Sequence, residues 1–155
     1  MSSMNQDGSN SGGWKDSDLR KALNKEVLAD MPKDLKNSIV KVKKLTNNEG
    51  VTTDASSVTE TNDSVWVPSV TELFRKDELE SQLNSAFKDL LSDWYPVYEA
   101  EGAQYDFWYG TGDTDAWTRT CDASESGLFM TYQGIKFGCG SKASRAYGVF
   151  PGFCL

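Results

Sequence analysis

The spacing of apolar residues changes once along the chain, near Tyr98. Before this point apolar residues recur at intervals of three and four, a pattern typical of amphipathic helices. After it, aromatic residues crowd among glycines and acidic residues, and the helical periodicity is lost. Turn-forming clusters there separate four short apolar segments, which predict the strands of a small antiparallel sheet: residues 117–121, 127–132, 135–140 and 147–155. We therefore expect one α+β domain, with two or three helices packed on this sheet.

The first half carries two predicted helical segments. One starts at Asp16 or Ser17, either of which provides the N-cap, and presents one apolar face: Leu19, Ala22, Leu23 and Val27. Pro32 then permits a fresh helical turn through Leu35 and Ile39. A strand-like stretch follows, in which Val40 and Val42 alternate with three lysines that we expect on its solvent face: Lys41, Lys43 and Lys44.

Two segments are almost free of large apolar residues. Met1–Gly13 predicts a disordered or tag-like polar leader, so the domain itself is expected to span residues 14–155. The leader has no apolar run, and an exported protein would therefore need its export signal upstream of this chain. Thr46–Asp63 predicts a mobile surface connection, after which Val65–Val67 should form a short buried strand.

Capping-box spacing marks two further helix starts. Ser69 and Glu72 stand three residues apart and predict a short helix through Val70 and Leu73. The same signature recurs ahead of a longer apolar pattern, which predicts a helix over residues 76–94.

Charge and composition exclude several functions. The chain of 155 residues has 16 Lys and Arg against 23 Asp and Glu, a formal net charge of −7. Such a surface repels phosphate backbones, and no apolar run is long enough to span a bilayer, so we expect neither nucleic-acid binding nor membrane insertion. The absence of histidine removes the Ser-His-Asp and Cys-His catalytic devices and histidine-ligated zinc.

The three cysteines lie in the last third of the chain, at Cys121, Cys139 and Cys154. Their spacing matches neither a redox motif nor a metal knuckle. A disulfide between Cys139 and Cys154 is one interpretation for an oxidising compartment, and three reduced thiols packed as small apolar groups are the other. A nucleophilic role would need a neighbouring base, and histidine is not available.

Aromatic and acidic residues of the second half offer a ligand site. Flat apolar faces mixed with acceptors suit sugar or peptide recognition, and residues 105–117 supply both. The alternative is that most of these aromatics fill the core. The run Gly112–Asp115 offers oxygens for calcium but lacks the remaining ligands of an EF-hand loop, so a hydrogen-bonded turn is the simpler interpretation. Arg119 is expected to act as a structural clamp for carbonyls or carboxylates rather than to contact a substrate.

Six short motifs occur in a characteristic order. They are GGWKDSDLRKALN, MPKDLKNSIVKVKKLTNN, VWVPSVTELF, EGAQYDFWY, WTRT and GVFPGFCL. In this order they resemble the domain-of-unknown-function family numbered 6273, which occurs mostly in surface or secreted proteins of bacteria, and residues 76–94 look like an insertion. The layout is also similar, more distantly, to C-type-lectin-like folds, which include formylglycine-generating enzymes and retroelement-diversified receptor-binding proteins.

The resemblance implies a C-type-lectin-like domain whose last strand is Gly148–Leu155 and whose C-terminal loops bind ligands. We therefore expect a non-catalytic ligand-binding or display module of a bacterial surface, secreted or phage-associated protein, extracellular and part of a larger polypeptide or assembly. Its partner would be a glycan or a protein, with no cofactor unless calcium binds. The alternatives are a retroelement-diversified receptor-binding protein, and an enzyme of the formylglycine-generating or carboxylate-dependent hydrolase type. The expected binding patch mixes tyrosines with small charged residues: Tyr109, Asp113, Asp115, Asp122, Glu125, Tyr132, Arg145 and Tyr147.

Overall fold

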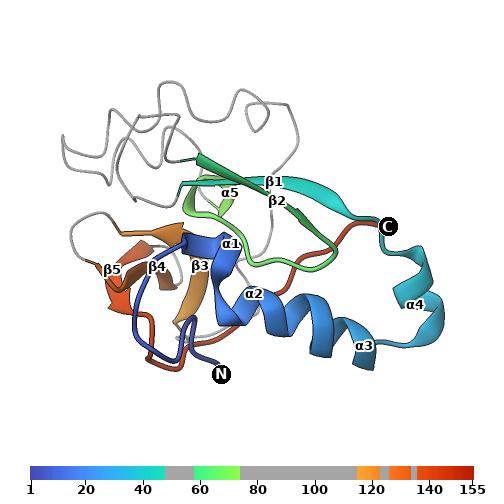
Figure 1. The fold of residues 1–155 in the computed structure, drawn as a ribbon, viewed down its shortest axis with the longest axis horizontal. Helices are drawn as coiled ribbons and strands as arrows, with labels where there is room; N and C mark the ends of the chain where they lie inside the picture. Colours follow the sequence, from blue (N-terminus) through green and yellow to red (C-terminus); the bar gives the residue numbers. More distant parts are fainter. Residues whose placement is uncertain (48–57, 74–114, 123–125, 134–135) are drawn as a thin grey trace.

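The computed structural model describes residues 1–47, 58–73, 115–122, 126–133 and 136–155. The described helical segments are α1 (Gly13–Asp16), α2 (Asp18–Ala22), the π-helical turn η1 (Leu23–Val27), α3 (Leu28–Asp30), α4 (Lys33–Ser38) and α5 (Val70–Leu73). The strands are β1 (Val42–Asn47), β2 (Val58–Asp63), β3 (Ala116–Cys121), β4 (Leu128–Gln133) and β5 (Lys136–Lys142). Helices and two small antiparallel sheets thus form the α+β domain that the sequence predicts (Figure 1). The predicted helix over residues 76–94 lies outside the described residues.

The long helical segment begins at Ser17, one of the two predicted N-caps. Its Oγ accepts a hydrogen bond of 3.1 Å from the Arg20 N–H. From there α2, η1 and α3 follow one another along a single rod (Figure 1). Leu19 and Leu23 are buried in the core, as predicted.

Val27 departs from the predicted apolar face. It is 39% exposed, and its neighbour Leu28 packs against the core instead. The cause is the π turn, in which the Leu28 N–H donates to the Leu23 carbonyl five residues earlier and so widens the helix. Asn24 lies in this turn, and its amide nitrogen donates to the Arg20 carbonyl at 3.1 Å and to the Val65 carbonyl at 2.7 Å.

The two-stranded sheet corrects the prediction for Thr46–Asp63. That segment contains the end of β1 and all of β2, which pair antiparallel from Val42 opposite Asp63 to Asn47 opposite Val58. Thr61 and Asp63 are buried although they are polar, because each has a hydrogen-bonding partner inside the fold. A polar strand of this kind carries no apolar alternation by which it could be recognised.

The three-stranded sheet has the order β3-β4-β5, and all neighbours are antiparallel. Ala116 lies opposite Tyr132, which in turn lies opposite Phe137. The three strands correspond to the first three of the four predicted segments.

The fourth predicted strand is wrong. Residues 147–155 form no strand of the sheet but an extended strap with isolated bridges to four separate segments: Tyr147 to Ser2, Gly148 to Ala116, Gly152 to Trp66 and Cys154 to Val40. Pro151 has no N–H with which to continue a ladder, and glycines on either side weaken strand formation. Phe153 lies outside any strand and is 38% exposed.

Residues 1–13 are packed against the domain, contrary to the predicted loose leader. Met4 is fully buried, and its N–H donates to the Ala143 carbonyl at 2.9 Å while its carbonyl accepts from the Leu19 N–H at 3.0 Å. Asn5 Oδ1 accepts a bond of 2.9 Å from the Asp18 N–H. The polar composition is therefore compatible with order, because these side chains and the main chain bond to the rest of the domain.

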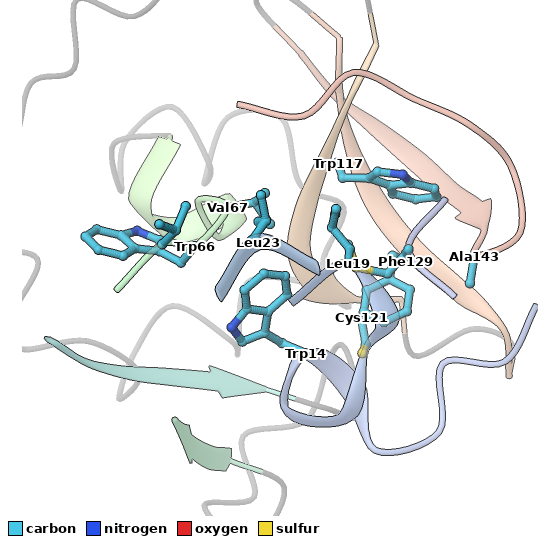
Figure 2. Packing of buried hydrophobic residues seen from close by; sticks show 11 residues of the cluster. Trp14, Leu19, Leu23, Trp66, Val67, Trp117, Cys121, Phe129 and Ala143 are labelled. Atoms are coloured by element: carbon cyan, nitrogen blue, oxygen red, sulfur yellow. The ribbon is translucent and has the colours of Figure 1, made fainter. Parts of the chain in front are cut away.

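The core lies between the α1–α2 segment, the Val65–Val67 segment and the β3-β4-β5 sheet (Figure 2). Tryptophans make up much of its volume: Trp14, Trp66 and Trp117 are all buried. Trp117 packs edge to face on Phe129, with ring centroids 6.3 Å apart. Val65–Val67 is buried as predicted but forms a single bridge rather than a strand. In the part of the chain that is described, no helix has the length and hydropathy needed to cross a membrane.

Candidate functional site

Three charged side chains, from α5, β3 and β1, form a buried ion network. Arg119 of β3 is fully buried and forms an ion pair with Glu72, whose side chain is 5% exposed. The Arg119 guanidinium also donates to Thr46 Oγ1 and to the Val67 carbonyl, both at 3.0 Å. Lys44 of β1 completes the buried ion network, because its Nζ lies 3.1 Å from Glu72 Oε1. Arg119 is thus the predicted structural clamp.

Lys44 was expected on the solvent face of its strand together with Lys41 and Lys43. Lys41 and Lys43 are exposed, but the side chain of Lys44 is only 11% exposed, and its Nζ lies 3.9 Å from the centroid of the Trp66 ring. Successive side chains of a strand point to opposite faces, so Lys43 and Lys44 cannot share one face. The sequence therefore contained the signal that one of them turns inward.

A second buried carboxylate joins the helical rod to β2. Asp63 is fully buried, and its Oδ2 accepts from Trp14 Nε1 at 2.9 Å and from Thr61 Oγ1 at 2.8 Å. Its Oδ1 lies 2.7 Å from Arg20 Nε. Both oxygens are used in holding the fold together, so the geometry favours a structural role for this carboxylate.

Cys121 and Asp122 lie at the end of β3, and both are buried. Burial, with a smaller contribution from the Asp122 charge, raises the pKa of the Cys121 thiol from 9.0 to about 12. A thiol with such a pKa stays protonated at neutral pH and is a poor nucleophile. The Asp122 carboxylate lies against Gly140 of β5, where an added Cβ would approach Asp122 Oδ2 to 2.0 Å. Glycine is therefore the residue that leaves room for this carboxylate.

Tyr147 is the centre of the polar surface cluster, which we define as Ser141, Arg145 and Tyr147. The Tyr147 hydroxyl accepts a hydrogen bond of 3.1 Å from Ser141 Oγ, and its ring packs edge to face on Trp117 with centroids 4.8 Å apart. Hydrogen bonds from Ser141 and Arg145 lower the pKa of Tyr147 below its ordinary value of 10.0, because donors stabilise the phenolate, while burial and the charge of Asp115 act in the opposite direction.

Three of the predicted patch residues, Asp115, Arg145 and Tyr147, lie near the start of the strap. Asp115 is joined to the strap because its carbonyl accepts a bond of 2.8 Å from the Gly148 N–H. Ser141, near the end of β5, was missed, although it stands in the same polar stretch of sequence as Arg145. Two patch residues are buried instead, Asp122 and Tyr132.

The remaining predicted site residues cannot be placed in the same way. Tyr109, Asp113 and Glu125 lie outside the described residues, as does most of the Gly112–Asp115 run considered for calcium. Within the part of the chain that is described, no three His, Cys, Asp or Glu side chains gather in a way that could hold a metal ion.

The predicted disulfide has no support from the structure. Cys154 is a half-buried free thiol that pairs through its backbone with Val40. The strand that carries Cys139, β5, lies at the opposite side of the molecule from the C-terminus in Figure 1. The structure does not describe the side chain of Cys139, so a disulfide between Cys139 and Cys154 stays a prediction.

Fold and site together define a small α+β domain with a tryptophan-rich core, two buried ionic clusters and a polar surface cluster at its C-terminal strap. The model of the domain-of-unknown-function family DUF6273 matches residues 2–155. The chain therefore belongs to this family, as its six ordered motifs predicted. Comparison with curated proteins and with solved structures found no match.

Proposed function

We propose that this chain is a non-catalytic binding or display module of a bacterial surface, secreted or phage-associated protein, and that it contacts a glycan or a protein through its C-terminal loops. The observation that carries the proposal is the polar surface cluster. It combines Tyr147, at the start of the strap, with the Ser141 hydroxyl of β5, and the exposed Arg145 lies between them in the chain. Tyrosines supply contact area at a low cost in conformational entropy, and small polar groups add hydrogen bonds.

The chemistry of the buried groups supports a binding role over catalysis. Arg119 and Glu72 form an ion pair inside the fold, the buried Asp63 forms an ion pair with Arg20, and burial raises the pKa of the Cys121 thiol to about 12. Groups of this kind stabilise a domain but do not meet a substrate.

A glycan and protein array, probed with the labelled full chain, tests the proposal. We expect a specific ligand whose binding is weakened by Arg145→Ala and Tyr147→Phe, while Lys142→Ala, an exposed cation of the same turn, leaves binding unchanged. Each variant is first shown to keep the thermal unfolding of the parent. The protein would instead be an enzyme if it turned over glycan or thiol substrates and if substitution of an acidic residue or a cysteine abolished that turnover.

We further propose, from the resemblance of the motifs, a C-type-lectin-like arrangement and an extracellular location. Support comes from the early helices, a small antiparallel sheet and a tryptophan-rich core. A crystal structure of the full chain compared with lectin-like domains tests the arrangement. Protease accessibility on intact cells tests the location, and protection of the chain until lysis would contradict it.

A further inference from the structure

Exposed apolar side chains gather where the strap ends. Val40, Phe153 and Leu155 are 50%, 38% and 74% exposed, and they are three of the five large apolar residues that are exposed in the described part of the chain. The Val40 N–H donates to the Cys154 carbonyl at 3.0 Å, so Val40 lies beside the other two. In Figure 1 this end of the chain lies where α4 leads into β1. Single apolar residues are ordinary on a surface, but a group of them favours an interaction site.

The main chain of the strap end is an open strand edge. Gly152 exchanges both of its main-chain hydrogen bonds with Trp66, at 2.7 and 3.0 Å, and the Cys154 carbonyl bonds to Val40. Successive residues of an extended chain direct their N–H and C=O groups to opposite sides, so those of Phe153 point away from both partners. Among the described residues, no hydrogen bond reaches the N–H or C=O of Phe153. An edge of this kind can accept another strand.

Charge beside this edge is positive although the whole chain is acidic. Three lysines and one acid, Lys33, Lys36, Lys41 and Asp34, precede or follow Val40 closely in the chain and give a local net charge of +2, against −7 for the whole chain. In the part of the chain that is described, none of these lysines takes part in an ion pair. Salt screens charges over about 8 Å, so these lysines act on a docked partner more strongly than distant acids do. The edge therefore favours an acidic partner, whereas a second copy of the chain would bring the same lysines together.

We propose that Val40 and Phe153–Leu155 bind an extended segment of a partner protein as an added strand, with apolar residues at alternate positions and acidic residues at its ends. This inference goes beyond the proposed function, because it assigns a second surface, separate from the polar surface cluster. Residues directly opposite each other in an antiparallel pair share one face, so the apolar residues of the partner lie opposite Phe153 and Leu155. An anionic membrane is disfavoured, because hydrocarbon would leave the main-chain groups of this edge without partners.

The peptide acetyl-Glu-Glu-Val-Thr-Val-Glu-Glu-amide has this pattern, and its binding to the full chain is followed by amide shifts in NMR. The peptide in which lysines replace all four glutamates should bind about 10-fold more weakly or less. N-methylation of both valines should abolish binding, because the N–H groups of the residues opposite Phe153 and Leu155 face the strap. N-methylation of the threonine and of the glutamate before the first valine, whose N–H groups face away, should change binding less than about threefold.

Matched variants of the chain test the same surface, after each is shown to keep the thermal unfolding of the parent. Phe153→Ala should weaken peptide binding about 10-fold, whereas Val27→Ala, which removes a side chain of nearly equal exposure on the helical rod, should leave it unchanged. Lys41→Gln should weaken it about 2–5-fold, and Lys15→Gln, at an exposed lysine of α1, less than about twofold. Hydrogen exchange should show the Phe153 amide becoming protected in the complex, while the Gly152 amide, which is already bonded to Trp66, changes little.

Several outcomes would overturn the inference. They are no binding of the acidic peptide, equal binding of the lysine peptide, equal losses from the two methylation patterns, an unprotected Phe153 amide, and equal effects of Phe153→Ala and Val27→Ala. Tighter binding to phosphatidylglycerol vesicles, or a dimer of the chain that Phe153→Ala dissociates, would assign the edge to a membrane or to a second copy and would also overturn it. The alanine variants of the strap end and the variants of the polar surface cluster test different surfaces, so this inference and the proposed function can fail separately.

Discussion

Replacing Lys44 with Met should destabilise the fold far more than replacing Lys43 with Met, although each of these β1 lysines forms an ion pair with a glutamate. Lys44 Nζ lies 3.1 Å from Glu72 Oε1 and 3.9 Å from the centroid of the Trp66 ring. Lys43 Nζ lies even closer to its partner, at 2.7 Å from Glu60 Oε2, but these two side chains are 61% and 47% exposed. Burial therefore distinguishes the two pairs.

The expected magnitudes follow from that burial. A desolvated cation over an aromatic ring contributes about 2 kcal/mol, and removing one partner of a buried ion pair costs about 3–5 kcal/mol. Glu72 keeps Arg119 as a partner, and Met preserves the packing of the lysine stem, so we expect Lys44→Met to lower the free energy of unfolding by about 2–3 kcal/mol. An exposed pair contributes about 0.2–1 kcal/mol, so Lys43→Met should have a small effect.

Urea unfolding followed by far-UV circular dichroism measures both variants. With a denaturant slope of about 2 kcal/mol per molar, Lys44→Met should lower the midpoint by about 1–1.5 M. A double-mutant cycle of Lys44→Met with Glu72→Gln should show a coupling of about 1 kcal/mol or more, as expected for residues in one ionic network. Equal midpoints for Lys43→Met and Lys44→Met, or no coupling in the cycle, would refute the assignment of Lys44 to the buried ion network.

Further predictions concern the thiol, the phenol and the N-terminal segment. Because the pKa of Cys121 is raised, the folded state keeps the thiol proton at pH values where the unfolded chain loses it, and the free energy of unfolding should fall by about 1.4 kcal/mol per pH unit between pH 9 and 12. In urea unfolding at several pH values, Cys121→Ala should lose less stability over this range. An equal loss in the parent and in Cys121→Ala would contradict the burial of the thiol. Native alkylation followed by mass spectrometry should modify the half-buried Cys154 before Cys121. Ser141→Ala should raise the pKa of Tyr147 in an absorbance titration, and no change would contradict the hydrogen bond. Met4→Ala should cost about 2–5 kcal/mol in urea unfolding, whereas a loose leader would show no loss.

Local signals in the sequence predicted much of the fold. Ser69 and Glu72 form the predicted capping box, in which the Glu72 N–H donates to Ser69 Oγ at 3.2 Å and the Ser69 N–H to Glu72 Oε2 at 2.9 Å. Strands β3, β4 and β5 follow the predicted segments because apolar residues and turn-forming clusters delimit them. Each of these features depends on residues close together in the chain.

Features that depend on distant partners were missed. Ser2 pairs with Tyr147, and Met4 with Ala143, so the order of the first residues comes from the far end of the chain. Strand β2 is polar, and it is buried because Asp63 finds Trp14 and Arg20 in the helical rod. A polar segment is indistinguishable from a loop until those partners are known.

In the candidate site, too, local sequence signals gave only part of the answer, and distant contacts decided the rest. Arg145 and Tyr147 were selected for their residue types and for their place near the C-terminal end, and the structure leaves Arg145 exposed and Tyr147 partly exposed where a turn meets the strap. Asp122 and Tyr132 have the same residue types as Asp115 and Tyr147, yet both are buried. The residue type determines which interactions a side chain can make, but its exposure determines whether a ligand can contact it. The exposure of a side chain in a short strand depends on the segments packed around that strand.

Glu72 shows how a local motif becomes part of the core. Its spacing from Ser69 fixes the carboxylate at the start of α5, and this part of its role is visible in the sequence. Lys44 on β1 and Arg119 on β3 then approach the same carboxylate from strands in two different sheets. Removing Glu72 would therefore loosen the cap of α5 and leave two buried cations close together, a larger penalty than the loss of a helix cap alone. The capping box therefore also takes part in joining the two sheets, beside the direct hydrogen bond from Arg119 to Thr46.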